Sequence, residues 1–186
     1  MGLRQDPAPA CAACAYTTER LTVGPWHAVA AEGAGADLAS TVAAILTPAV
    51  TASLPDEWQG PFGLERARRW IEQRDGEGAT LLARDHVSGQ AVGLLVLHER
   101  ADASDPVVDV RLGYLVAESA WGQGYGRELV GGFVGWCRGQ PAVRSLAGGV
   151  EAGNVASIRI LEACGFVPEA GAADDDALLY RLDFAT

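Results

Sequence analysis

The segment YLVAESAWGQGYGREL, residues 114–129, passes from an apolar run through three alternating glycines into a helical pattern. Glycine has no Cβ and adopts positive φ freely, so a turn built on Gly122, Gly124 and Gly126 lets a ligand approach the backbone closely. The helix that follows begins with amides that have no partner inside the helix, and its dipole makes that end positive. The segment therefore predicts a strand, a glycine turn and a helix start that together bind an anion, most often a phosphate.

A second helix start follows across one expected strand, in VEAGNVASIRILEACGF, residues 150–166. Asn154 precedes the helical pattern and Ser157 lies within its first turn. Asparagine is a preferred N-cap in its own right, so Asn154 and Ser157 could serve only to start the helix. Three glycines alone could likewise make only a tight strand–helix turn. The two stretches in this order favour a joint binding site.

The remaining pattern predicts one layered α/β domain with helices on both faces of a sheet. Expected strands cover 21–30, 79–84, 91–98, 107–116 and 143–150, with one or two more at Phe166 and over 178–184 and a loop at 174–176 between them. Expected helices cover 36–46, 64–73, the glycine turn to about 138, and 154–164. In the helix over 64–73, Leu64, Ala67, Trp70 and Ile71 share the inward face. We expect residues 1–18 to be a largely disordered tail and 19–186 to be the domain.

Charge and composition exclude several classes of protein. The formal net charge of −10 disfavours a nucleic-acid partner, because phosphate backbones need clustered basic residues. No apolar run approaches the roughly 20 residues that cross a bilayer, and the first 15 residues do not resemble a signal peptide, so a cytoplasmic location without a membrane partner is expected. Cys11 and Cys14 form a CxxC without a second ligand pair, so no metal site is predicted. The oligomeric state is left open, with a homodimer among the options.

The turn formed by Trp121, Gly122, Gln123, Gly124, Tyr125 and Gly126 resembles the pyrophosphate loop of the GCN5-related N-acetyltransferases, the GNAT superfamily. The pattern Asn154-x-x-Ser157 followed by Leu161-Glu162-x-Cys164-Gly165-Phe166 is similar to the second acetyl-CoA motif of that superfamily. With Gly113-Tyr114 ahead of the turn, the form resembles the branch that acetylates the N-termini of ribosomal proteins. The specific motifs occupy about residues 109–166.

The resemblance implies a GNAT fold: a mixed, mostly antiparallel sheet of six or seven strands with flanking helices and a splayed central strand pair. It also implies acetyl-CoA as co-substrate and no metal. The pantetheine arm would pair with the backbone of Leu115 and Val116, and Asn154 would bind its amides. The residues expected to hold the coenzyme are Leu115, Val116, Trp121, Gly122, Gln123, Gly124, Tyr125, Gly126, Arg127, Asn154 and Ser157.

The catalytic residues are less clearly marked. Many relatives carry a tyrosine proton donor where this chain has Leu161, and in the similar branch a serine that matches Ser157 serves the leaving thiolate. Relatives often carry a glutamate base where this chain has Arg111. Asp109, two residues earlier on the same strand face, and Glu151, at the end of the next strand, are the two candidates for that base.

The sequence thus predicts an acetyl-CoA-dependent N-acetyltransferase that transfers acetyl directly to a primary amine, with a protein N-terminal amine favoured. An α-amine of pKa about 8 is roughly a tenth neutral at pH 7, whereas a lysine amine is far less so, and the weak base signal suits the α-amine. Two alternatives stay open. One is an acetyltransferase of small amines such as an antibiotic, a polyamine or an amino acid, and the other is a coenzyme-binding module without catalysis.

Overall fold

The computed structural model describes residues 10–32, 37–101, 105–169 and 177–184. One eight-stranded sheet runs through the molecule in the order β1-β2-β3-β4-β5-β6-β8-β7. The strands are β1 (Tyr16–Thr17), β2 (Leu21–Pro25), β3 (Ala79–Asp85), β4 (Ala91–Ala101), β5 (Val108–Val116), β6 (Val143–Glu151), β7 (Val167–Pro168) and β8 (Ala177–Asp183). Neighbours pair antiparallel except β5 and β6, which are parallel. The mixed, mostly antiparallel sheet is confirmed, with eight strands in place of six or seven.

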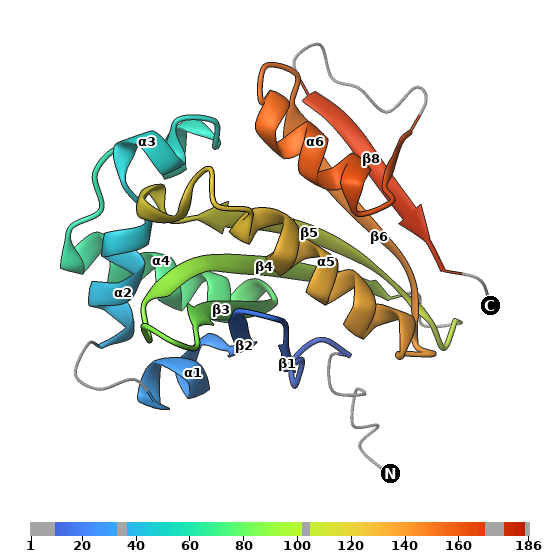
Figure 1. The fold of residues 1–186 in the computed structure, drawn as a ribbon, viewed down its shortest axis with the longest axis horizontal. Helices are drawn as coiled ribbons and strands as arrows, with labels where there is room; N and C mark the ends of the chain where they lie inside the picture. Colours follow the sequence, from blue (N-terminus) through green and yellow to red (C-terminus); the bar gives the residue numbers. More distant parts are fainter. Residues whose placement is uncertain (1–9, 33–36, 102–104, 170–176, 185–186) are drawn as a thin grey trace, which may run out of the picture.

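Helices cover both faces of this sheet (Figure 1). They are α1 (Trp26–Glu32), α2 (Leu38–Ile45), α3 (Pro48–Thr51), α4 (Leu64–Glu77), α5 (Tyr125–Arg138) and α6 (Val155–Ala163), with 3₁₀ turns η1 (Asp56–Trp58) and η2 (Glu118–Ala120). In Figure 1, α5 crosses in front of β4 and β5, whereas α4 lies behind the sheet. The apolar stripe of α5 predicts this placement, since Leu129, Phe133 and Cys137 are all buried.

The central pair β5 and β6 separates along its length. Their pairing runs from Val108–Val143 to Arg111–Ala147 and ends there, although both strands continue. Beyond that point β5 stays paired with β4 as far as Val116, and β6 stays paired with β8. The expected splay of the central strands is therefore present, and it frees the facing edges of the two strands at the end where the glycine turn begins.

Three features of the structure differ from what the sequence predicts. The strand expected over 21–30 ends at Pro25, and Trp26 begins α1, because Trp26, Val29 and Ala30 share a buried face at helical spacing. Pro48 starts the short helix α3, in a stretch where no helix is expected, and the Thr47 hydroxyl accepts from the Val50 amide. Leu64 is 47% exposed at the first position of α4.

The tail expected over residues 1–18 includes a segment, residues 10–18, that packs against the domain. Residues 1–9 lie outside the described residues, but Cys11 and Cys14 are fully buried and Tyr16 begins β1. The amides of Ala10 and Cys11 donate to the carboxylate of Glu99 at 2.9 and 2.6 Å. Burial raises the pKa of the Cys14 thiol to about 12. Residues 10–18 thus extend the core of the domain.

No helix in the described part of the chain is long and apolar enough to span a bilayer. Across these same residues, no group of three or more His, Cys, Asp or Glu side chains has the arrangement of a metal site.

Candidate acetyltransferase site

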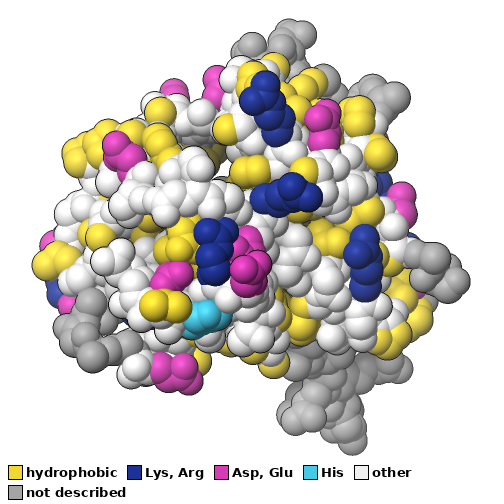
Figure 2. Space-filling view, viewed as in Figure 1, with side chains coloured by type: hydrophobic (Ala, Val, Ile, Leu, Met, Phe, Trp, Pro, Cys, Tyr) yellow, Lys and Arg dark blue, Asp and Glu magenta, His cyan; other side chains and the backbone are white. Residues whose placement is uncertain are grey.

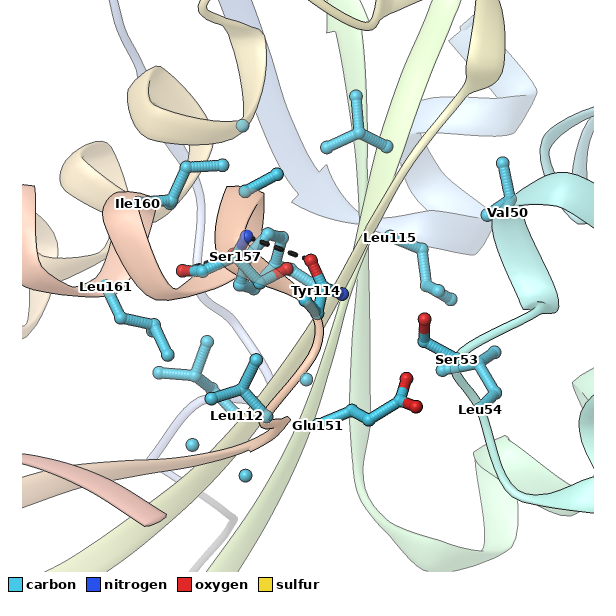
Figure 3. A pocket seen from close by; sticks show the side chains of 18 of the residues that line it. Val50, Ser53, Leu54, Leu112, Tyr114, Leu115, Glu151, Ser157, Ile160 and Leu161 are labelled. Carbon is cyan, nitrogen blue, oxygen red and sulfur yellow. Dashed lines mark hydrogen bonds between the residues drawn. The ribbon is translucent and has the colours of Figure 1, made fainter. Parts of the chain in front are cut away.

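A cleft of about 1210 Å³ opens where β5 and β6 separate. One wall comes from the end of β5, the glycine turn and the start of α5, and a second from the end of β6 and the start of α6. The third wall comes from α3, η1 and α4, where Val50, Ser53 and Leu54 face the cavity (Figure 3). The volume exceeds the few hundred Å³ typical of a small-ligand pocket and suits two substrates at once.

The glycine turn has the geometry that its sequence predicts. Gly122 and Gly124 have φ of +72° and +83°, a region in which side chains with a Cβ are strained. A Cβ on Gly126 would stand 2.8 Å from Ile160 Cδ1 of α6 and 3.3 Å from Val116 Cγ2 of β5. Glycine at this position therefore permits the close approach of α5, α6 and the end of β5.

The first turn of α5 lacks a side-chain cap. Its N-cap is Gly124, which has no side chain to accept from the helix amides, and Gly124, Tyr125, Gly126 and Arg127 all line the cleft. Uncapped amides at a helix start attract negative charge through hydrogen bonds and the helix dipole. Arg127 from α5 and Arg159 from α6 also line the cleft, and Figure 2 shows basic and acidic side chains interspersed across the face that carries these helices. Two arginines therefore stand beside the helix starts, although the net charge of the chain is −10.

Arg20, which the sequence does not mark, braces the glycine turn from a distant part of the chain. Its guanidinium donates to the Gln123 carbonyl at 3.0 Å and to the Glu128 carboxylate at 2.7 Å. It also lies 4.1 Å from the centre of the Tyr125 ring, whose hydroxyl donates to Asp85 at 2.8 Å. No local signal could reveal this contact, because 103 residues separate Arg20 from Gln123.

The second helix start combines a cap with an exposed edge of the cleft. Asn154 Oδ1 accepts from the Ser157 amide at 3.1 Å, which confirms the N-cap interpretation, and both residues line the cleft. The Tyr114 hydroxyl donates to the Ser157 carbonyl at 3.3 Å, beside Ser157 in Figure 3. Burial raises the pKa of Tyr114 to about 12, so this phenol stays protonated at neutral pH. Tyr114, which the sequence marked only as part of the Gly113-Tyr114 pair, thus places a second hydroxyl group near Ser157.

Asp109 is not placed to act as a base. It lies outside the cleft lining and accepts from Arg144 Nε at 3.1 Å, from Arg181 at 3.3 Å and from the Ser145 hydroxyl. The Arg144 guanidinium, opposed by burial and helped by Ser145, holds the pKa of Asp109 well below its usual range. Asp109 shares a strand face with Arg111, but it sits along the paired part of β5 and β6, away from the splayed end.

Two other groups in the cleft can accept a proton. Glu151, at the end of β6, extends its carboxylate toward Ser53 and Leu54 in Figure 3. His98 on β4 pairs in register with Arg111 on β5, and both line the cleft. The His98 Nδ1 lies 3.0 Å from the Glu77 carbonyl, which can only accept, so Nδ1 carries the proton and Nε2 of a neutral ring keeps its lone pair. His98 is exposed, and no motif in the sequence marks it as a residue of this cleft.

Most of the expected coenzyme residues meet at the cleft, with Gln123 as the exception. Leu115, Val116, Trp121, Gly122, Gly124, Tyr125, Gly126, Arg127, Asn154 and Ser157 line it. Trp121 is 48% exposed, and its indole donates to the Val116 carbonyl at 2.8 Å. The Gln123 side chain instead donates to the Ser119 carbonyl at 2.8 Å, within the turn.

These residues fit a long coenzyme that carries a diphosphate. The uncapped amides and Arg127 suit its phosphates, and Leu115 and Val116 lie past the last β5–β6 pair, where the edge of β5 that faces β6 has no strand partner in the described part of the chain and leaves room for an extended arm. The close approach allowed by Gly126 brings the two helix starts to one cleft. The donor set therefore suits coenzyme A better than a compact anion.

Comparison with known proteins agrees with this site. A family model described as an acetyltransferase (GNAT) domain matches residues 32–167, so the chain belongs to the GNAT acetyltransferase family. The recognition made from the glycine turn and Asn154-x-x-Ser157 is confirmed. No curated protein matches the sequence.

Solved structures share the fold at low sequence identity. A GNAT-family acetyltransferase from Bacillus anthracis is 16% identical with a TM-score of 0.72, covering 91% of this chain and 98% of that one. The ribosomal-protein-S5-alanine acetyltransferase from Vibrio fischeri is 15% identical, TM-score 0.60, with coverages of 91% and 96%. RimL, the ribosomal L7/L12 α-N-protein acetyltransferase in complex with coenzyme A, is 16% identical, TM-score 0.66, with coverages of 90% and 96%.

Proposed function

We propose that this acetyltransferase uses acetyl-CoA to acetylate a primary amine directly, with a protein N-terminal amine as the favoured acceptor. The observation that carries the proposal is the meeting of two helix starts, at Gly124 and Asn154, beside the open end of β5 and β6. One start offers uncapped amides for the diphosphate, and the other presents Ser157. The solved relatives named for ribosomal-protein acetylation support the choice of acceptor by analogy.

Acetyl-CoA supplies the acetyl group as a thioester. The neutral amine nitrogen forms a bond to the acetyl carbon, the carbon–sulfur bond breaks, and the sulfur leaves with the electron pair. Gly122, Gly124, Gly126 and Arg127 bind the diphosphate, and Leu115 and Val116 hold the arm along β5. The Ser157 hydroxyl donates to the leaving sulfur, since it lies in the first turn of α6 at the cleft.

The amine must lose a proton on the acceptor side of the cleft. Glu151 takes this role in our proposal, directly or through water, because it is the carboxylate of the two original candidates that lines the cleft. A base of this kind is worth roughly 10²–10⁴-fold in rate. The demand on it is modest for an α-amine, of which roughly a tenth is already neutral at pH 7.

The deciding experiment measures thiol release from acetyl-CoA with a panel of N-terminal peptides, a polyamine, amino acids and lysine peptides. Faster release with peptide α-amines supports the favoured acceptor, and a clear preference for a free small amine supports the small-molecule alternative. Coenzyme binding without acceptor-dependent release would instead support a module that has lost catalysis. Because the chain contains no lysine, acetylation of lysine on the enzyme itself cannot add to the signal.

We also propose that the protein acts without a nucleic-acid partner, because the net charge is −10.

A further inference from the structure

An arginine in the cleft wall formed by α3, η1 and α4 has a nitrogen, Nε, that makes no hydrogen bond to the described residues. Arg74 of α4 is only 7% exposed, yet it lines the cleft. Its Nη2 donates to Glu77 at 2.6 Å, while its Nε is buried with no hydrogen-bond partner among the described residues. A buried donor without an acceptor is destabilising, and more so when it carries charge. Arg74 Nε therefore lacks a hydrogen bond within the described chain, and an oxygen atom of a bound substrate would supply one.

The Arg74 guanidinium is also held in a fixed orientation. Its central carbon lies 4.3 Å from the centre of the Trp58 ring and 5.7 Å from that of Trp70. An arginine stacked on an aromatic ring keeps the edges of its planar fork available, and that fork matches the two oxygens of a carboxylate. The arrangement is therefore prepared for a planar anion rather than for a neutral amide.

A second arginine faces the same space. Arg111 of β5 is exposed, lines the cleft, and takes part in none of the ion pairs found among the described residues. The carboxylates on this side are Glu77, which is paired with Arg74, and Glu151. The cleft lining therefore contains both an arginine, Arg111, without an ion pair to any described residue, and the carboxylate of Glu151, a combination that suits a zwitterion.

We propose that the acceptor carries a carboxylate close to its amine, bound by Arg74 with help from Arg111, while the amine lies toward Glu151. This inference rests on the proposed amine acetylation and narrows its substrate class. A free amino acid and a peptide with Asp or Glu among its first residues share this chemistry. The arginines then select the acceptor, and Glu151 and Ser157 serve the reaction itself.

Matched acceptors test the proposal. Thiol release from acetyl-CoA is measured with an Ala-Glu peptide against its Ala-Gln counterpart, and with an amino acid against its amide. Wild-type kcat/KM should favour the carboxylate member by roughly 10- to 100-fold, as expected for one charge-assisted bidentate contact. Preference in the peptide pair alone identifies an acidic N-terminus, and preference in the amino-acid pair alone identifies a free amino acid.

Variants then locate the source of the preference. Arg74→Gln should bring the ratio of the two kcat/KM values close to one. Arg66→Gln is the control, because Arg66 lies on the same helix and is likewise stacked, 4.2 Å from Phe62, but it donates to backbone carbonyls and does not line the cleft. A ratio taken within one variant is unaffected by a general loss of activity. A preserved ratio in Arg74→Gln would overturn the assignment.

Each failure has a distinct signature. Equal rates for carboxylate and amide acceptors in the wild type would overturn the carboxylate inference and leave amine acetylation standing. Coenzyme binding without release for any acceptor would remove the proposed function as well. If Arg74→Gln does not fold, Arg111→Gln at its exposed position carries the test: a fall in the ratio supports the inference and an unchanged ratio contradicts it.

Discussion

The guanidinium of Arg20 and the carboxylate of Glu128 join the chain ahead of β2 to the first turn of α5, at 2.6–2.7 Å. The same guanidinium holds the Gln123 carbonyl, so the glycine turn is fixed from outside as well as by its own backbone. An anion site made of amides depends on their direction, because hydrogen bonds weaken steeply with angle. We therefore expect Arg20 to affect coenzyme binding by orienting the amides of the turn and not by direct contact.

Replacing Arg20 should weaken coenzyme binding. We expect Arg20→Ala to raise the Kd for coenzyme A roughly 3- to 10-fold in calorimetry, a modest effect because the pair is partly exposed. Arg138→Ala, at the other end of α5, is the matched control. Equal effects of the two substitutions would mean that general charge, and not the brace, matters.

The ion pair between Arg20 and Glu128 predicts that the stability of the folded protein depends on pH. Burial alone would raise the pKa of Glu128, but hydrogen bonds from Thr18 and Arg20 outweigh it and hold the pKa below the usual 4.5. A lowered pKa gives stabilisation that is complete above 4.5 and is lost as pH falls through the folded-state value. Coenzyme Kd should therefore be constant from pH 8 to pH 6 as far as Glu128 is concerned. In Glu128→Gln the acid-dependent part of unfolding, followed by circular dichroism below pH 4.5, should diminish.

Ser157 separates chemistry from binding. Ser157→Ala should lower kcat at least tenfold and leave the coenzyme Kd within about twofold, since the Asn154 cap bonds the backbone amide and survives the change. Asn154→Ala is the contrasting variant, because it removes the cap and should also lower the melting temperature. An unchanged kcat in Ser157→Ala would remove the serine from the mechanism.

Asp109 should prove structural. Asp109→Asn leaves Arg144 and Arg181 without their carboxylate, so the thermal midpoint should fall while kcat stays within about twofold. The pKa of Asp109 is depressed, so its contribution is present above its usual pKa of 3.8 and is lost only as pH falls below it. Melting at pH 7 and at pH 5 should therefore show the same loss. A fall in kcat without loss of stability would restore Asp109 as a base.

The loss of the general base should change how kcat/KM depends on pH. Glu151→Gln should reduce kcat/KM roughly 10- to 100-fold at pH 7 and much less at pH 9, where an α-amine acceptor is already neutral. His98→Gln is the comparison variant, because His98 also lines the cleft and its Nδ1, not its Nε2, is the ring nitrogen that contacts the Glu77 carbonyl. A deficit that appears in His98→Gln and not in Glu151→Gln would transfer the role to His98.

Local patterns predicted the part of the molecule that local interactions build. The glycine turn, the stripe of α5 and the Asn154 cap are each contained within a few consecutive residues, and all three are present. The strand expected over 21–30 was carried past Pro25, although a proline can both end a strand and precede a helix. In the structure β2 ends at Pro25 and α1 begins at Trp26. The expected Glu151 reached the cleft and Asp109 did not, since only the end of the strand pair opens.

Contacts between distant segments were beyond the reach of the sequence. Arg20 meets the glycine turn only after β1 and β2 pack beside α5, and Arg74 of α4 meets the Trp58 ring of η1 only in the folded chain. On a helical pattern Arg74 is an ordinary charged residue near a C-terminus. Cys11 is a similar case, because its amide donates to Glu99 of β4, 88 residues further along the chain.

The central claim is that amides of the glycine turn at the start of α5 bind coenzyme A, and calorimetry on the double variant Gly122→Ala/Gly124→Ala tests it most directly. Gly89→Ala is the control, since Gly89 has φ of +70° in a hairpin and does not line the cleft. We predict saturable binding of coenzyme A to the wild type and to Gly89→Ala, and a Kd raised at least tenfold in the double variant. Equal affinity in all three proteins, or no binding heat from the wild type, would contradict the account.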